Sequence, residues 1–463
     1  MLYSISKYFI IFLCLYSAIA QSQSPYSGGG TTVFDSSVDA YTKPANNLTF
    51  YKRQSFFIGN SFFRNPWVIA PSSTTARDGL GPLFNTNTCE SCHVRDGRGL
   101  PHIRNKPLVA LLVRLNVNSE ATSNDDANLI RQGLITDPAY GNQIQHQSIP
   151  GVPAEATVTL EWSETIVEFA DGSSAQLRKP QVILSQLAYG EFHDKVALSA
   201  RTAPAMIGLG LLEAIPESTL KQISQDQLQS NNGVSGKLNR VWAQRLQKTV
   251  PGRFGWKAGM PNVEQQVASA FSADIGITSS IFPESSCTKK QTKCLSARSG
   301  GKPELDDEFL GFITSYSKTL AVPARRNIRH KQVILGEQYF REAGCHQCHV
   351  ETIKTGEDKN FPALSWQEIH PYTDLLLHDM GEGLADHSRE FLATGVEWRT
   401  PPLWGIGLMK TVNGHTNLLH DGRARNIEEA ILWHHGEAEA TRDHYVDMPK
   451  HKRQALVKFI ESL

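Results

Sequence analysis

The chain has 463 residues, in which 46 lysines and arginines balance 46 aspartates and glutamates. A chain of this length has room for about two or three domains with ordinary cores. The absence of net charge argues against nucleic acid or an anionic membrane as the main partner, because both attract basic proteins. Composition alone therefore does not indicate the function, and the motifs have to be considered.

The N-terminus has the pattern of a secretory signal peptide. Lys7 precedes an apolar run from Tyr8 to Ala20, and Ala18 and Ala20 form a small-x-small site that predicts cleavage near Gln21. This run is shorter than the roughly 20 apolar residues that cross a membrane, so an uncleaved anchor is the less favoured alternative. We therefore expect an exported, periplasmic protein with no membrane span after cleavage.

Residues 21 to about 50 are rich in serine, glycine and threonine, which predicts a poorly ordered lead-in. The first chemical motif follows later as C-x-x-C-H at Cys89, Cys92 and His93. In such a motif two thiols bond to the vinyl groups of one haem, and the adjacent histidine binds the iron. His102 is a candidate for a labile ligand on the opposite face, although a surface loop histidine is the favoured alternative.

The middle of the chain contains one strand pattern and one cysteine pair. Residues alternate in polarity from Thr157 to Lys179 around an Asp-Gly turn, which predicts a β-hairpin inserted into a mainly helical body. Further on, Cys287 and Cys294 could close a small loop as a disulfide in an oxidising compartment. Two free thiols are the alternative, because spacing does not determine geometry.

A second C-x-x-C-H is formed by Cys345, Cys348 and His349, after a helical pattern from Val333 to Glu342. A zinc site made by the four thiols and a thioredoxin-like redox pair are the competing interpretations. Zinc held by four thiolates would need neither histidine, and a thioredoxin-like pair would need a βαβ setting that the pattern lacks. Two occurrences in an exported chain therefore favour two covalently bound haem c groups.

The second half also offers candidate ligands for the other face of its haem. L-L-L-H-D-M-G supplies His378 and Met380, L-L-H-D-G-R-A supplies His420, Met409 is more remote, and His346 is badly placed inside the motif. Methionine would give a high-potential haem and histidine a lower one, because a thioether favours ferrous iron. For each residue, a core or loop position without iron contact is the alternative.

Three blocks recur in the same order in both halves, which indicates a duplicated module. Besides the haem motifs, R-T-A-P-A-M-I-G-L-G-L from Arg201 matches R-T-P-P-L-W-G-I-G-L from Arg399. W-K-A-G-M-P-N-V-E-Q-Q from Trp256 aligns without a gap with H-D-G-R-A-R-N-I-E-E-A from His420. We expect a mainly α protein of two fused cytochrome c-like domains, with the small hairpin inserted in the first. The expected segments are a signal peptide (1–20), a lead-in (21–78), haem domain I (79–325) and haem domain II (326–463).

The chain resembles the bacterial di-haem cytochrome c peroxidases and the MauG-type enzymes, and most closely the branch of di-haem oxidoreductases, also called thiol oxidoreductases. The resemblance rests on both C-x-x-C-H motifs and on C-H-V-R-D-G-R-G, G-L-G-L-L-E-A-I-P, F-G-W-K-A-G-M-P-N-V-E-Q-Q-V, H-D-M-G and L-L-H-D-G-R-A-R-N-I-E-E-A-I-L-W-H, which run from about Gly79 to the C-terminus. It implies that the C-terminal haem receives electrons from an external donor, such as a cytochrome c, a cupredoxin or a quinol-linked protein. The N-terminal haem then reacts with hydrogen peroxide.

The same resemblance implies catalytic residues. Trp256 matches a tryptophan that relatives place between the haems, and Gln266 matches a glutamine of the same stretch. Asp274 takes the place of a glutamate that helps to cleave the O–O bond, and a carboxyl group one methylene shorter can still move a proton. The alternatives are a helix cap for Asp274 and a core position for Trp256.

Two implications concern metals. Relatives commonly take the sixth ligand of the C-terminal haem from a methionine directly before H-D-G, where this chain has Leu419. Met380 or His378 would then have to replace it. Relatives also bind a calcium ion between the domains, partly through a T-x-P stretch that Thr400 and Pro402 match, so the resemblance allows for one calcium ion.

These observations predict a periplasmic di-haem oxidoreductase that reduces hydrogen peroxide with electrons from an external donor. An electron-transfer cytochrome with no substrate of its own is the first alternative, and it would need two six-coordinate irons. A MauG-like enzyme that oxidises side chains of a partner protein is the second alternative.

Overall fold

The computed structural model of the chain describes residues 24–101, 108–118 and 126–463. The predicted signal peptide and His102 lie outside the described residues. Among the described residues, no helix is both long and apolar enough to cross a membrane.

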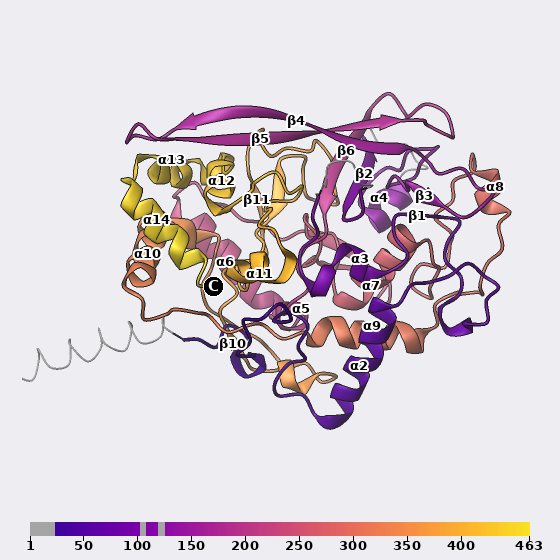
Figure 1. Cartoon of the computed structure of the whole chain (residues 1–463), viewed down its shortest axis with the longest axis horizontal. Coiled ribbons are helices and arrows are strands. Elements are labelled where there is room, and N and C mark those ends of the chain that lie inside the picture. Colours follow the sequence, from indigo (N-terminus) through magenta and orange to yellow (C-terminus); the bar gives the residue numbers. More distant parts are fainter. Residues whose placement is uncertain (1–23, 102–107, 119–125) are drawn as a thin grey trace, which may run out of the picture.

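The helices gather in two main groups on opposite sides of the view (Figure 1). The first group contains α2 (Phe50–Arg64), α7 (Val263–Ala270) and α9 (Asp307–Thr319), and the second contains α10 (Lys331–Glu342), α12 (Ile427–Leu432), α13 (Glu439–Asp447) and α14 (Lys450–Ile460). The other α-helices are α3 (Cys89–Cys92), α4 (Asp126–Gln132), α5 (Leu209–Glu213), α6 (Glu217–Ser230), α8 (Thr292–Leu295) and α11 (Met409–Asn413). Short 3-10 turns are η1 (Gly29–Thr31), η2 (Thr75–Arg77), η3 (Val94–Asp96), η5 (Cys345–Gln347), η6 (Pro362–Leu364), η7 (Ile406–Leu408) and η8 (Gly436–Ala438).

The expectation of a mainly α fold is wrong. Helices make up 32% of the structure and strands 18%, and the strands form many small sheets. Most of these strands have two to four residues, too few for an alternating pattern to be visible in the sequence. The antiparallel pairs are β1 (Leu83–Phe84) with β3 (Gln147–Ser148), β2 (Leu111–Val117) with β6 (Val196–Thr202), β4 (Thr157–Glu168) with β5 (Ser174–Ser185), β7 (Arg240–Ala243) with β8 (Lys248–Pro251), β9 (Ile353–Lys354) with β10 (Glu368–Ile369), and β11 (Leu377–Asp379) with β12 (Glu397–Arg399).

The predicted hairpin is confirmed and is longer than expected. Thr157 pairs with Ser185 at its open end, so the ladder runs beyond Lys179. The hairpin runs along one side of the molecule, above α12 and α13 at one end and above β2 and β6 at the other (Figure 1). Its open end packs on β2 through Leu160, and the guanidinium of Arg178 donates to the main-chain carbonyl of Arg423 at 3.0 Å. This insertion in the first half therefore ties the two halves together.

The duplicated helices begin in the same way. Asn262 caps α7 by accepting a hydrogen bond from the Gln265 amide, and Asn426 caps α12 by accepting one from the Glu429 amide. An asparagine side chain at this position satisfies an amide that the first helical turn leaves unpaired. The shared asparagine of the two W-K-A-G and H-D-G-R blocks is therefore the start signal of one helix in each half.

The two halves share their largest hydrophobic core. Ile207, Phe271 and Leu310 from the first half pack in one cluster with Trp404 and Val412 from the second. A second cluster lies among α10, α12 and α14 of the C-terminal half. The expected boundary near residue 325 stays a prediction, since burial of common apolar surface joins the halves across it.

Two local expectations concern the ends of the first half. The described part of the lead-in is ordered, because Val33 and Pro44 form bridges to Pro323 and Leu320 and α2 packs against α9. Polar composition missed this order because the lead-in pairs with a distant segment of the chain. Cys287 and Cys294 form the predicted disulfide, with their Cα atoms 5.9 Å apart.

Candidate haem sites and the cavity between them

One cavity is lined by both C-x-x-C-H motifs. The four thiols of these motifs are free, and burial raises the pKa of Cys89 and Cys345 to about 12, so both are neutral thiols at physiological pH. Among the described residues, only Cys348, Asp374 and His378 bring three possible metal-ligand atoms within 4.8 Å of one another. The four thiols therefore do not converge on a common zinc ion.

The histidines of the two motifs are held in the same way. The Nδ1 of His93 lies 2.8 Å from the main-chain carbonyl of Pro204, and the Nδ1 of His349 lies 2.9 Å from that of Tyr372. A carbonyl oxygen can only accept, so Nδ1 carries the proton and Nε2 remains for a metal. Burial lowers the pKa of both imidazoles to about 4, which keeps them neutral. Free thiols and oriented histidines on one cavity wall fit a haem at each motif.

Trp256 lies between the two halves and lines the cavity. Its indole nitrogen donates to the main-chain carbonyl of Thr202 at 2.8 Å, and its own carbonyl accepts from the amide of Arg399 at 2.9 Å. The guanidinium of Arg98 lies 4.9 Å from the centre of the ring. The predicted tryptophan therefore contacts the R-T block of each half.

Gln266 and Asp274 line the same cavity. α7 continues into a π-helical turn, η4 (Phe271–Ile275), which ends at Gly276 with φ of 75°. Asp274 lies in this turn, and π-helical turns of this kind are frequent at functional sites. Burial raises the pKa of its carboxyl group to about 6, although a hydrogen bond from Gln143 and the charge of Arg114 oppose the shift. The Oε1 of Gln266 is buried without a hydrogen-bond partner among the described residues.

Two residues next to Asp274 were not predicted from the sequence. The Nε2 of Gln143 donates to Oδ1 of Asp274 and to Oδ1 of Asn85, each at 2.8 Å. The Oε1 of Gln143 accepts from the guanidinium of Arg114 at 3.2 Å, and Arg114 itself lines the cavity from β2. Gln143 lies in a loop and Arg114 on a short strand, and neither belongs to a motif. Only the fold brings these side chains to Asp274.

The predicted sixth ligands of the second haem lie in different surroundings. Both ring nitrogens of His378 contact carboxylates, Nδ1 with Glu437 at 2.7 Å and Nε2 with Asp374 at 2.8 Å. Burial alone would lower the pKa of His378, but the charge of Asp374 raises it well above its usual value. Met380 and Leu419 line the cavity and are half-buried. His378 would have to leave a carboxylate in order to bind iron, whereas Met380 would not.

The T-x-P stretch does not fit a calcium ion. The main-chain carbonyl of Thr400 accepts from the hydroxyl of Thr373 at 2.6 Å and from the guanidinium of Arg399 at 3.1 Å. The same guanidinium donates to the main-chain carbonyl of Gly255 at 2.9 Å. Burial lowers the pKa of Arg399 to about 10, so it stays charged at neutral pH. A fixed cation thus already occupies the Thr400 carbonyl, one of the oxygens that calcium would need.

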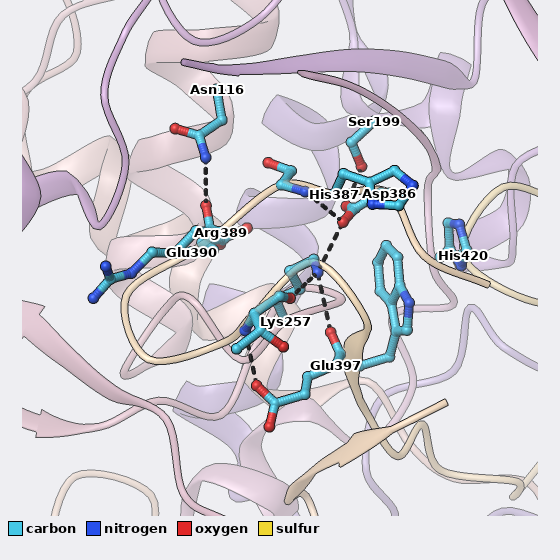
Figure 2. Close-up of polar contacts among 12 residues, drawn as sticks. Asn116, Ser199, Lys257, Asp386, His387, Arg389, Glu390, Glu397 and His420 are labelled. Carbon is cyan, nitrogen blue, oxygen red and sulfur yellow. Dashed lines mark hydrogen bonds and ion pairs between the residues drawn. The ribbon is translucent and has the colours of Figure 1, made fainter. Parts of the chain in front are cut away.

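An ionic cluster surrounds Lys257, the residue that follows Trp256 in the sequence (Figure 2). The ammonium of Lys257, with a fully buried side chain, lies 3.0 Å from Asp386 and donates to the main-chain carbonyl of Thr394 at 2.7 Å. Asp386 also accepts from the hydroxyl of Ser199 at 2.6 Å. Buried charges of this kind hold only when they are paired and hydrogen-bonded. The loop around Asp386 in the second half is therefore clamped to the first half.

Comparison with known protein families agrees with this geometry. A family model described as "di-haem oxidoreductase, putative peroxidase" matches residues 22–463. No curated protein gives a significant match to the chain. Because the match covers almost the whole length, the chain belongs to the di-haem oxidoreductase family.

Proposed function

We propose that this protein is a peroxidase-like enzyme that reduces hydrogen peroxide to water: H2O2 + 2 H+ + 2 e− gives 2 H2O. The two electrons come singly from an external donor such as a cytochrome c, a cupredoxin or a quinol-linked protein. The observation that carries the proposal is the carboxyl group of Asp274, with its pKa raised to about 6, in a cavity that also reaches both haem motifs. A pKa near the working pH is what proton transfer requires.

The haem groups would be held covalently. Cys89 and Cys92 would form thioether bonds to the first, and Cys345 and Cys348 to the second. His93 and His349 would each bind an iron through Nε2. When bound, the two groups supply one-electron redox chemistry, which lets a two-electron reduction proceed with single-electron donors.

Asp274 would move the proton. In its deprotonated form it takes a proton from one oxygen of peroxide and delivers it to the departing oxygen, which leaves as water. The hydrogen bond from Gln143 occupies Oδ1 and so leaves Oδ2 to face the substrate. The buried Oε1 of Gln266 can accept a hydrogen bond from the peroxide, and the guanidinium of Arg114 can stabilise negative charge on the departing oxygen.

Trp256 would carry single electrons between the halves, because it contacts the R-T block of each. The direction would be from the C-terminal motif to the N-terminal motif, where Asp274 lies. The Cys287–Cys294 disulfide supports an oxidising, periplasmic location after removal of a signal peptide. Met380 or His378 as the sixth ligand of the second haem stays a prediction.

The test is peroxide turnover by the purified holoprotein with a reduced cytochrome as donor. We expect Asp274→Asn to lower turnover by roughly 100-fold or more while both haems remain attached. The matched control is Asp194→Asn, since the Asp194 side chain is 80% exposed, and it should leave turnover unchanged. Equal turnover in both variants would contradict the role of Asp274. No turnover in the wild type, with both irons six-coordinate, would instead favour an electron-transfer cytochrome.

A further inference from the structure

We infer that His434 is the sixth ligand of the iron at the second haem motif. The starting observation is that histidines lining the cavity differ in what their ring nitrogens contact. They are His93, His349, His378, His420 and His434.

His434 shares its hydrogen bonding with the two histidines of the haem motifs. Its Nδ1 lies 2.7 Å from the main-chain carbonyl of Ala430, one helical turn earlier, while those of His93 and His349 lie 2.8 and 2.9 Å from their carbonyls. In each case the carbonyl fixes the proton on Nδ1 and leaves Nε2 as the free electron-pair donor. This arrangement is typical of histidines that bind metals.

The other two histidines of the cavity are engaged differently. His378 contacts a carboxylate through each ring nitrogen. The ring of His420 stacks flat on the indole of Trp398, with centroids 3.7 Å apart and planes 9° apart, and its Nε2 lies 3.4 Å from Asp421. Either would have to break its present contacts to bind iron, whereas His434 needs no such change.

The duplication places His434 on a helical face that lines the cavity. When the gapless alignment of the two blocks is continued four residues beyond Gln266 and Ala430, four residues of the first helical segment correspond to four of the second, and all eight line the cavity. They are Val263, Gln266, Val267 and Ala270 in the first half, and Ile427, Ala430, Ile431 and His434 in the second. This spacing is one face of a helix. The same helical face therefore lines the cavity in each half.

The two helical faces differ at the position of His434, which could bind an iron. In the first half, His434 corresponds to Ala270, whose methyl group leaves space for a small substrate beside Gln266 and Asp274. In the second half, the imidazole of His434 occupies that position. The first haem would then be open for peroxide and the second closed by a protein ligand, as expected for a reacting site and a relay.

The inference differs from the expectation of a methionine ligand in a measurable way. Met380 and Met409 also line the cavity, but ligation by His434 gives the second iron two nitrogen ligands. Its reduction potential would then be lower than with a thioether. The inference deepens the proposed function, yet it requires only that the second haem be bound, not that peroxide be reduced.

The test uses absorption and electron paramagnetic resonance spectra of the oxidised holoprotein without peroxide. We expect the wild type to contain a low-spin haem with two nitrogen ligands and no charge-transfer band of a methionine–iron bond. His434→Ala should convert this haem to high spin, and added imidazole should restore it. His434→Met should introduce the methionine band and raise the potential. Met380→Leu should leave the spectra unchanged.

A methionine–iron band in the wild type that disappears in Met380→Leu would overturn the inference. So would a low-spin spectrum that survives unchanged in His434→Ala. The wild-type and Met380→Leu spectra decide the question even if His434→Ala does not fold, because they depend on no histidine variant. If the wild-type protein shows the expected low-spin spectrum but does not reduce peroxide, that result would count against the proposed function and leave this assignment intact.

Discussion

The main-chain amide of Arg399 donates a hydrogen bond to the main-chain carbonyl of Trp256, 2.9 Å away. Arg399 belongs to the second copy of the R-T block, whereas Trp256 lies in the first half, so this bond joins the two repeats. In the opposite direction, the amide of Thr202 donates to the carbonyl of His420 at 2.7 Å. His420 is the residue that aligns with Trp256. The R-T block of each repeat therefore donates a main-chain hydrogen bond to the first residue of the W-K-A-G or H-D-G-R block of the other repeat.

Replacing Trp256 with phenylalanine should separate its electronic role from its structural one. Loss of the hydrogen bond to Thr202 should cost about 0.5–1.5 kcal/mol of unfolding free energy, measured in urea. Peroxide-dependent oxidation of the donor should slow, because phenylalanine is much harder to oxidise than indole. The matched control is Trp366→Phe, since Trp366 is 72% exposed. Unchanged donor oxidation in Trp256→Phe would exclude the tryptophan from the electron path.

The pH dependence of peroxide turnover should follow the protonation of the Asp274 carboxyl group. Burial raises the pKa of this carboxyl group to about 6, and the proton-accepting form is the carboxylate. The second-order rate constant kcat/KM for peroxide should therefore rise with pH through about 6 and then level off. Asp274→Asn should remove this step. A profile with the same step in Asp274→Asn would assign it to another group.

Gln143 should act as a positioning residue for Asp274. In Gln143→Leu the hydrogen bond that lowers the pKa of Asp274 is lost, so the step in the pH profile should move above about 6 and kcat should fall. Leaving Asp274 and Asn85 without this donor should cost roughly 1–3 kcal/mol of stability. Gln222→Leu, at an exposed glutamine, is the control. A fall in stability without a shift of the pH step would indicate a purely structural role.

Lys257 should be essential for stability. In Lys257→Met the carboxylate of Asp386 loses its buried ammonium partner, which should cost about 3–5 kcal/mol of unfolding free energy. Lys221→Met, which removes an exposed ion pair with Glu217, should cost no more than about 0.5 kcal/mol. Urea unfolding of both variants measures the difference. Similar small losses in both would mean that the cluster around Lys257 is hydrated.

Treatment with EDTA should leave the stability and the haem spectra unchanged. The guanidinium of Arg399 already donates to the main-chain carbonyl of Thr400, so this oxygen is not free for a calcium ion. Thermal unfolding with and without the chelator is the measurement. A fall in the unfolding temperature that added calcium reverses would show that a calcium ion is bound.

The sequence predicted those parts of the site whose chemistry is local. Both haem motifs and the duplicated blocks around Trp256 are visible in the sequence itself, and the Cys287–Cys294 disulfide was expected from an oxidising compartment and confirmed by the structure. Residues that act only through tertiary contacts were not predicted. Gln143 lies far from Asp274 in the sequence, and Arg114 lies on a strand that pairs with β6. His434 lies four residues beyond the aligned block, and its hydrogen bond to Ala430 could be seen only in the structure.

The fold was predicted less well than the site. Long amphipathic helices such as α10 have a visible period, whereas strands of two to four residues such as β11 and β12 have none. Such short pairs form where neighbouring loop segments satisfy each other's main-chain groups. This is why the mainly α expectation failed while the long β4–β5 hairpin was predicted.

The central claim is that peroxide is reduced in this cavity by electrons from an external donor. The most direct measurement is the oxidation of a reduced cytochrome c by the holoprotein after addition of hydrogen peroxide. We expect about two donor molecules to be oxidised for each peroxide, as the reaction requires two electrons, and Asp274→Asn to abolish most of this oxidation. Donor that stays reduced in the wild type, with every one-electron donor tested, would contradict the claim.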